Sequence, residues 1–142
     1  RLRLLEWPRI RELTRAGFEF GAHTVNHPNL AELDEARARE EILGSKQRIE
    51  EAIGQPVRCF AYPYGAMPEA ARRMVAEHFA AGCSTCMGWI TPGSRAEALE
   101  RLDAYYLSST YLFRRLFGGP ARGYLALRRA LRAFNTSGRL YD

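Results

Sequence analysis

The feature that most constrains the fold is an alternation of short apolar stretches with amphipathic helical patterns, repeated three times along the chain. Helical periodicity is longest over residues 29–54 and recurs over 67–79. The apolar stretches between the helical patterns predict strands near residues 18–22, 57–61, 81–86 and 102–107. This spacing is typical of βα units, so we expect an α/β fold with parallel strands and helices packed outside them.

Glycine and proline mark the ends of the expected helices. Pro8 suits the first turn of a short helix over residues 7–17, and Gly17 ends that helix. The long helix has acidic residues in its first turns, and Gly54 stands just after its last turn. Its apolar stripe is expected to face the core and consists of Ile42, Leu43, Ile49, Ala52 and Ile53.

Charge divides the chain into two parts. The 142 residues are 46% hydrophobic, which is enough for one domain with a core. The net charge is +5, but residues 111–142 hold seven arginines against Asp142 and sum to +6, so the rest sums to −1. We therefore expect a domain over residues 1–110 and a basic helical extension over residues 111–142.

The basic extension could in principle bind nucleic acid or a membrane surface. Its arginines, however, are interleaved at helical spacing with Leu125, Leu127, Leu131 and Phe134. This pattern favours a helix docked on its own domain. We expect no nucleic-acid partner and no membrane span, because no apolar run approaches the roughly 20 residues that cross a bilayer. No signal peptide is recognisable in the sequence.

Three cysteines exclude a complete disulfide framework, because their number is odd. Cys83 and Cys86 have the spacing of a redox motif, which normally begins a helix. Here the flanking residues are small and apolar, as in a strand. The sequence therefore favours two buried thiols in a core strand over a redox pair.

Two of the three histidines, His23 and His27, lie four residues apart. On a helix they would share one face, but Gly21 and Pro28 argue against a helix here. We expect instead a loop at the carboxyl end of a strand, where parallel α/β folds bind ligands. Two imidazoles there suit Zn²⁺, although hydrogen bonds that merely cap the loop would explain the same residues. The pair alone leaves both interpretations open.

A second distinctive stretch is Tyr62-Pro63-Tyr64-Gly65. Pro63 stiffens the end of the preceding strand, and Gly65 permits a sharp exit. Backbone N–H groups after Pro63 would point toward the strand end, where they could donate to a developing oxyanion. Taken alone, the stretch favours a structural aromatic–proline turn.

Together these segments resemble the middle of a polysaccharide deacetylase of the NodB homology type, in carbohydrate esterase family four. The residues from His23 to His27 match the H-[S/T]-x-x-H motif in full, and Pro63-Tyr64 match the following motif. The intervening helical pattern "EI..SK..IE..G" matches in spacing and character. The resemblance covers roughly residues 7–107 and implies a partial (β/α) barrel whose first strands are missing, followed by a C-terminal helix.

The resemblance also implies a function. It implies hydrolysis of N- or O-acetyl groups of a polysaccharide, dependent on Zn²⁺ or another divalent transition metal. His23 and His27 would be metal ligands, and the backbone N–H of Tyr64 would be an oxyanion donor. Thr24, Tyr62 and Pro63 would support the loops or contact substrate. Family resemblance further places such a protein in the cell envelope or outside the cytoplasm.

The sequence departs from the family at three points. The first motif, a Thr-Phe-Asp-Asp strand end with the general base and the third ligand, is absent, and Asp34, Asp103 and Asp142 do not replace it. Ala61 stands where many members have an arginine. The late Leu-x-x-His motif is also absent, and His78 is expected at a helix end.

These departures predict a truncated form that is inactive alone. It would associate with the missing N-terminal part or form a homo-oligomer. The alternative is a carbohydrate-binding relic of the same fold that has lost its catalytic activity.

Overall fold

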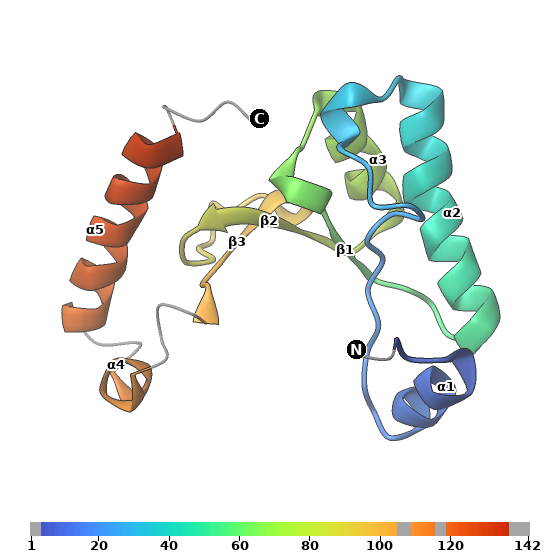
Figure 1. Cartoon of the computed structure of the whole chain (residues 1–142), viewed down its shortest axis with the longest axis horizontal. Coiled ribbons are helices and arrows are strands. Elements are labelled where there is room, and N and C mark those ends of the chain that lie inside the picture. Colours follow the sequence, from blue (N-terminus) through green and yellow to red (C-terminus); the bar gives the residue numbers. More distant parts are fainter. Residues whose placement is uncertain (1–3, 105–108, 116–118, 137–142) are drawn as a thin grey trace. The chain divides into compact units, whose positions relative to one another are not determined.

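The structure is a computed structural model that describes residues 4–104, 109–115 and 119–136 (Figure 1). The chain divides into two compact units, which are described separately. The first unit comprises Arg1–Thr85 and Ser94–Leu99, and the second comprises Cys86–Gly93 and Glu100–Asp142.

The first unit has the expected α/β order (Figure 1). Its helices are α1 (Trp7–Arg15), α2 (Glu35–Ile53) and α3 (Glu69–His78), with short 3₁₀ turns η1 (Leu30–Glu32), η2 (Pro63–Gly65) and η3 (Ala96–Ala98). The strands β1 (Cys59–Ala61), β2 (Ala81–Met87) and β3 (Leu99–Arg101) form one sheet in that order. β2 and β3 each continue from the first unit into the second.

The strands pair in parallel, as predicted. β1 pairs with β2 in a register that sets Cys59 opposite Ala81. Ala22, in the expected first strand, forms a parallel bridge with Phe60 on β1. The Ala22 N–H donates to the Cys59 carbonyl at 2.8 Å, and the Ala61 N–H donates to the Ala22 carbonyl at 2.9 Å. The residues that follow Ala22 and Ala61 therefore leave the sheet at the same end.

Helix α2 begins six residues later than predicted. The Asp34 side chain accepts a hydrogen bond from the Arg37 N–H at 2.8 Å and so caps the helix. The residues before Asp34 form η1 instead, which is capped by the Asn29 side chain. The C-terminal prediction is confirmed, because Gly54 adopts a left-handed conformation with φ +69°.

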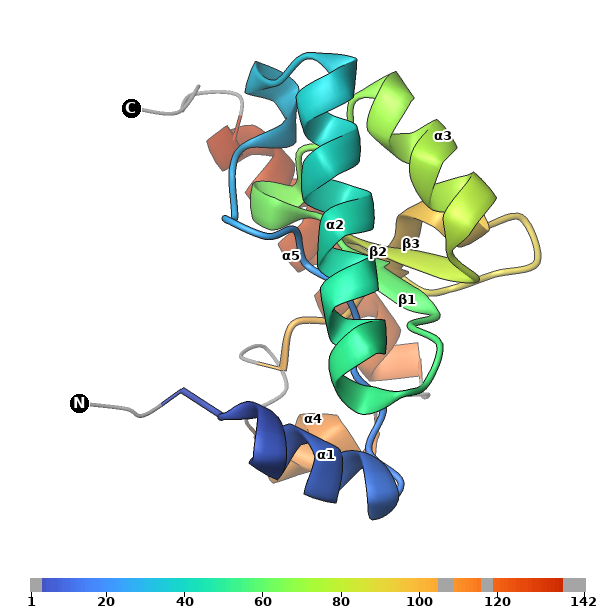
Figure 2. The same ribbon diagram turned by 90° about the vertical axis from the view of Figure 1, so that its right-hand side faces the viewer.

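The core of the first unit lies between the sheet and helices α2 and α3, which cover one face of it (Figure 2). Phe60 on β1 is buried, and its ring lies 5.1 Å from that of Tyr62 and 5.3 Å from that of Phe79. Ile42 from α2 and Val75 from α3 are fully buried in the same cluster. Burial of such side chains stabilises the fold by roughly 1.5–3 kcal/mol each. This core fixes the strand ends relative to α2.

Three sequence predictions about the sheet were wrong. Of the strand expected over residues 18–22, only Ala22 pairs, through the isolated bridge to Phe60. The last strand was expected at 102–107, but β3 is Leu99–Arg101, and residues 105–108 lie outside the described part of the chain. A hydrogen bond from the Ser84 hydroxyl to the Leu99 carbonyl, 3.0 Å, joins β2 to β3 at this earlier position. The two cysteines of β2 are also not both buried, because Cys86 is exposed and Cys83 only half-buried. The buried residues of β2 are Gly82 and Ser84, which share one face, and Met87, which packs with Leu125 in a separate cluster.

The second unit contains helices α4 (Thr110–Arg114) and α5 (Gly119–Thr136). The helix predicted in the basic extension over residues 111–142 is therefore confirmed. Leu125 on α5 is buried against Met87, whereas Leu127 and Leu131 are about half exposed. Across the described residues, none of the helices has the length and apolar character that crossing a membrane requires.

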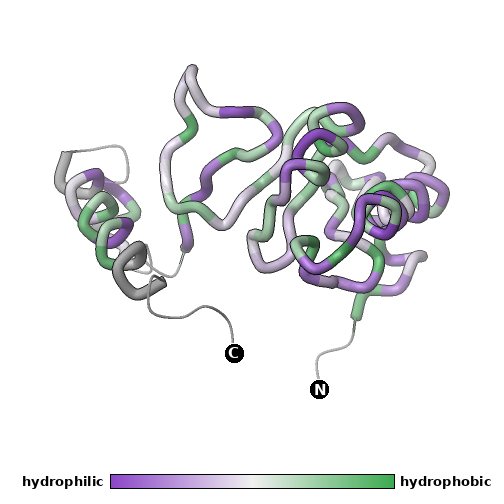
Figure 3. The backbone as a smooth tube through the Cα atoms, turned by 90° about the horizontal axis from the view of Figure 1, so that it is seen from above, coloured by the Kyte–Doolittle hydropathy of each residue, from purple (hydrophilic) through white to green (hydrophobic). Residues whose placement is uncertain are grey.

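The N-terminal part of the first unit presents apolar residues at its surface. Leu4 is 93% exposed and Leu5 55% exposed. In Figure 3 the described chain begins, next to the grey trace at the N label, with a green hydrophobic segment. Trp7, at the start of α1, is 44% exposed.

Candidate functional site

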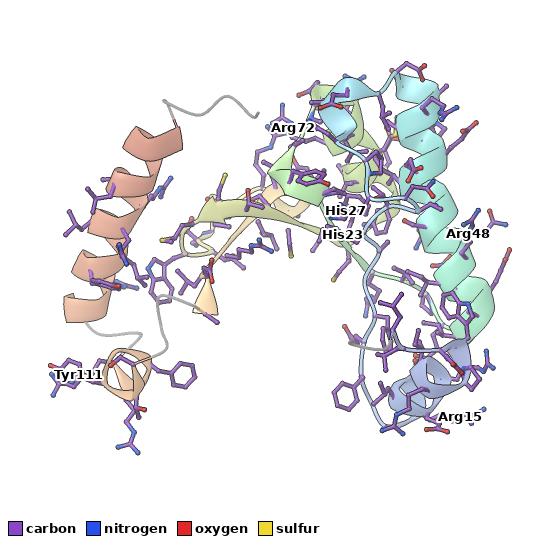
Figure 4. All side chains as sticks on the ribbon, viewed as in Figure 1. Arg15, His23, His27, Arg48, Arg72 and Tyr111 are labelled. Carbon is purple, nitrogen blue, oxygen red and sulfur yellow. The ribbon has the colours of Figure 1, made fainter. Side chains whose placement is uncertain are left out.

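His23 and His27 lie together at the end of the sheet where Ala22 and β1 finish (Figure 4). Their ring centroids are 4.7 Å apart, and the ring planes meet at 69°. Both side chains are exposed. The loop predicted from Gly21 and Pro28 is confirmed, because no helix connects the two histidines.

One hydrogen bond fixes the tautomer of the neutral His23 ring. Its Nδ1 lies 2.7 Å from the Ala61 carbonyl oxygen. Because a carbonyl only accepts, Nδ1 carries the proton and Nε2 has a free lone pair. A metal-binding histidine is commonly oriented in this way by a carbonyl on its other nitrogen. Nε2 is therefore the ring nitrogen of His23 through which a metal could bind.

The Thr24 hydroxyl ties the two ends of the histidine loop together. It donates to the His23 carbonyl at 2.6 Å and accepts from the His27 N–H at 3.1 Å. Thr24 has φ +61° and His27 has φ +58°, so both adopt a left-handed conformation that is uncommon for residues other than glycine. These turns bring the two imidazoles to the same side of the loop.

The Tyr62–Gly65 turn borders the histidines. Tyr64 has φ +55°, and its ring centroid lies 4.8 Å from that of His27. Within the turn the Gly65 N–H donates to the Tyr62 carbonyl and the Ala66 N–H to the Pro63 carbonyl. Neither hydrogen bond uses the N–H of Tyr64, the group expected to donate to an oxyanion.

Tyr62 and Pro63 are the first two residues of this turn, and both are buried. The Tyr62 hydroxyl donates to the Glu97 carbonyl at 2.7 Å. Burial, followed by the nearby Glu97 carboxylate, raises the pKa of Tyr62 far above its ordinary value. The Tyr62 side chain is thus a neutral part of the core, placed to support the turn from below.

Glu41, on α2, contacts the histidine loop and was not singled out from the sequence. Its Oε2 accepts from the N–H groups of Val25 and Asn26, each at 2.8 Å, and its Oε1 accepts from the Asn26 side chain at 2.6 Å. The available signal was an acidic residue beside Ile42, inside the apolar stripe of the helix.

Within the described part of the chain, the site has two nitrogen donors and no third ligand beside them. Among residues 4–104, 109–115 and 119–136, no group of three His, Cys, Asp or Glu side chains is placed to hold a metal. Asp34 caps α2, and the third histidine, His78, ends α3 next to Glu77. The two imidazoles fit the ligand preference of Zn²⁺, but they form only part of a three-ligand set.

Comparison with known proteins identifies the family. The sequence model of the polysaccharide deacetylase family matches residues 5–80, more than half of the 142 residues. The chain therefore belongs to the polysaccharide deacetylase family.

Solved structures support the same assignment. The deacetylase PplD of Streptococcus pyogenes, determined with acetate, is 25% identical with a TM-score of 0.66, over 69% of this chain and 44% of that one. A polysaccharide deacetylase from Bacillus cereus is 26% identical with a TM-score of 0.63, over 69% of this chain and 32% of that one. The predicted fold, part of the α/β architecture of these deacetylases, is confirmed.

Among curated proteins, the uncharacterized protein YlxY of Bacillus subtilis (strain 168) is 31% identical over 67 residues. That alignment covers 47% of this chain and 21% of the relative. The chain thus spans less than half the length of each of these three relatives.

Proposed function

We propose that this chain provides the histidine part of a metal-dependent site that removes N- or O-acetyl groups from a polysaccharide. The observation that carries the proposal is the pairing of His23 and His27, with His23 held through Nδ1 by the Ala61 carbonyl. Membership of the deacetylase family supports the reaction class. The substrate class is an acetylated polysaccharide.

His23 and His27 would hold Zn²⁺, or another divalent transition metal, through their ring nitrogens. When bound, the metal would polarise the acetyl carbonyl and make hydroxide available near neutral pH. Thr24 fixes the loop between the two ligands through its two hydrogen bonds. The imidazoles are therefore held in place before a metal arrives, which reduces the entropy cost of binding.

Tyr64 would act through its backbone. The two hydrogen bonds of its turn do not use its N–H, and its ring lies next to that of His27. An N–H fixed in this way can donate to the oxyanion that develops as the acetyl carbon becomes tetrahedral. Tyr62 and Pro63 hold the turn against the core, so that the donor does not have to reorganise during the reaction.

The reaction also needs a third ligand and a general base. We propose that carboxylates on another polypeptide segment, either an N-terminal part or a second copy of the chain, supply both. Losing a general base typically costs about 10²–10⁴-fold in rate. The 142-residue chain alone is therefore expected to release negligible acetate from partially acetylated oligosaccharides.

A non-catalytic carbohydrate-binding protein of the same fold is the second candidate. It is favoured by one observation: the described residues contain no third metal ligand. The two candidates differ in what a carboxylate-bearing segment would restore. A longer polypeptide with two aspartates at a preceding strand end should release acetate in a chelator-sensitive way if the chain is part of an enzyme. A longer polypeptide that binds oligosaccharides but releases no acetate would favour the second candidate.

Zinc binding tests the proposed ligands directly. Calorimetric titration of the wild-type chain should give weak binding, because only two ligands are present. His23→Ala and His27→Ala should each abolish it. His78→Ala is the matched control, since His78 lies at the end of α3 and should leave the affinity unchanged. Equal binding by all three variants would remove His23 and His27 from the metal role.

A further inference from the structure

The loop that joins the two histidines is attached to α2 by a single carboxylate. Between Thr24 and His27 there are only two residues, Val25 and Asn26, and both backbone N–H groups donate to Glu41 Oε2 at 2.8 Å. The Asn26 side chain donates to the other carboxylate oxygen at 2.6 Å. The Glu41 side chain thus accepts hydrogen bonds from both backbone N–H groups that lie between Thr24 and His27, the two residues with a left-handed backbone.

These hydrogen bonds are of the strong kind, because the acceptor is charged. Partial burial of Glu41 opposes ionisation, but the hydrogen bonds from Asn26 and Val25, helped by Arg37, outweigh it and lower the pKa of the carboxyl. The side chain is therefore ionised at neutral pH.

The Val25 side chain lies beside the same face of α2. A Cβ placed on Gly44, one turn after Glu41, would lie 3.5 Å from Cγ2 of Val25, an ordinary van der Waals distance. The loop is thus bonded through Glu41 to a helix that is itself packed on the core.

We infer that Glu41 is a positioning residue that sets the orientation of both imidazoles from α2. The reasoning is geometric. Thr24 and His27 have left-handed backbones at the two ends of the loop, and the only residues between them are bonded to Glu41. If Val25 and Asn26 moved, the direction of the chain at His23 and at His27 would change together. The proposed effect on metal affinity rests on the function proposed above, whereas the effect on the loop does not.

The test compares Glu41→Gln and Glu41→Ala with Glu40→Gln and Glu40→Ala in the full chain. Glu40 is the preceding residue of α2 and is exposed, and its side chain forms no hydrogen bond or ion pair with other described residues. Zn²⁺ affinity is measured by calorimetry. Hydrogen exchange at the Val25 and Asn26 amides and the ¹⁵N shifts of the His23 and His27 rings are measured by NMR on metal-free protein.

Removal of an outer-shell hydrogen-bonding group commonly lowers metal affinity by about 10–100-fold. We expect Glu41→Ala to lose affinity in that range, and Glu41→Gln to lie between it and the wild type because an amide oxygen still accepts. Exchange at Val25 and Asn26 should accelerate in the same order, while both Glu40 variants match the wild type. A Glu41→Ala/Asn26→Ala double variant should lose less than the sum of the single losses, because the two side chains are bonded to each other.

The outcomes separate the two claims. If the wild type binds no zinc, the proposed function fails, and the amide exchange and ring shifts of the Glu41 variants still decide the positioning role. If Glu41→Ala does not fold, Glu41→Gln carries the comparison. Unchanged exchange at Val25 and Asn26 in Glu41→Gln, with ring shifts equal to wild type, overturns the inference. If the wild type binds zinc, a folded Glu41→Ala variant with the same zinc affinity also overturns the inference.

Discussion

Replacing Gly65 with alanine should be among the most damaging small substitutions near the histidine site. Gly65 has φ +75°, and a Cβ at this position would lie 2.0 Å from Oγ1 of Thr85 and 2.9 Å from its Cβ and Cγ2. Real Cβ atoms essentially never come closer than 3.0 Å to another heavy atom. Either β2 or the turn that carries Tyr64 must therefore move.

The expected cost can be assembled from two parts. A left-handed conformation costs a residue with a side chain roughly 1–2 kcal/mol. Forcing an extra carbon into a packed position costs roughly 1–3 kcal/mol more. Gly65→Ala should therefore lower the free energy of unfolding by about 2–5 kcal/mol. Gly54→Ala isolates the first part, because Gly54 has φ +69° and nothing within 4 Å of an added Cβ.

Urea unfolding of wild type, Gly54→Ala, Gly65→Ala, Thr85→Ala and Gly65→Ala/Thr85→Ala measures both parts. Gly65→Ala should cost more than Gly54→Ala, and the difference should shrink in the Thr85→Ala background, where the nearest contact is gone. The reasoning would be refuted if Gly65→Ala cost no more than Gly54→Ala, or if removal of the Thr85 side-chain atoms left its cost unchanged.

Two further predictions concern hydrogen bonds. Glu50 accepts hydrogen bonds from the Lys46 side chain and from the Val57 N–H, and these bonds lower its pKa. The pKa of Glu41 is also lowered, because its hydrogen bonds outweigh its burial. Carboxyls with a lowered folded-state pKa stabilise the fold above their unfolded value of 4.5 and lose that contribution as pH falls below it. The urea concentration at the unfolding midpoint should therefore decrease as the pH is lowered from 5 to 3, and it should decrease less steeply in Glu50→Gln. An increase over this range would contradict the lowered pKa values. Thr24→Val removes both hydrogen bonds of the hydroxyl and should weaken zinc binding by about tenfold. Thr24→Ser keeps a hydroxyl and should retain the wild-type zinc affinity. Equal zinc affinities of the two variants in calorimetry would exclude a role for the Thr24 hydroxyl in holding the loop.

The elements that the sequence predicted well are those with strong local signals. Gly54 ended α2 as expected because a left-handed residue after a helix is most easily a glycine. The histidine loop followed from Gly21 and Pro28, which oppose a helix. The parallel arrangement followed from the regular spacing of strands and helices, and the pairing of Ala22 with Phe60 bears it out.

The features that sequence reasoning missed depend on contacts between distant residues. Leu30 is fully buried and resembles the first residue of a helical stripe, yet it belongs to η1, since Asp34 caps the helix later. β3 contains Glu100 and Arg101, which carry no apolar strand pattern, and is defined by its pairing with β2. Glu41 bonds to residues 15 and 16 positions away, a separation that no local periodicity reports.

The left-handed backbones of Thr24, His27 and Tyr64 bear on how the protein tolerates mutation. Each such residue raises the free energy of the native state by something on the order of 1–3 kcal/mol, and all three sit in one small region. Favourable contacts elsewhere in the fold, such as the buried core around Phe60, must offset that energy. A substitution that reduces core packing should therefore change the histidine loop and the Tyr62–Gly65 turn before the domain unfolds. The geometry of the two imidazoles should then be lost at a lower temperature than the fold. Glycine at any of the three positions would relieve the backbone strain, but it would also remove the side chain and loosen the loop that orients the neighbouring rings. Natural variation at these positions should thus be limited by the need to orient the side chains of the site. Stability alone would favour glycine at each position.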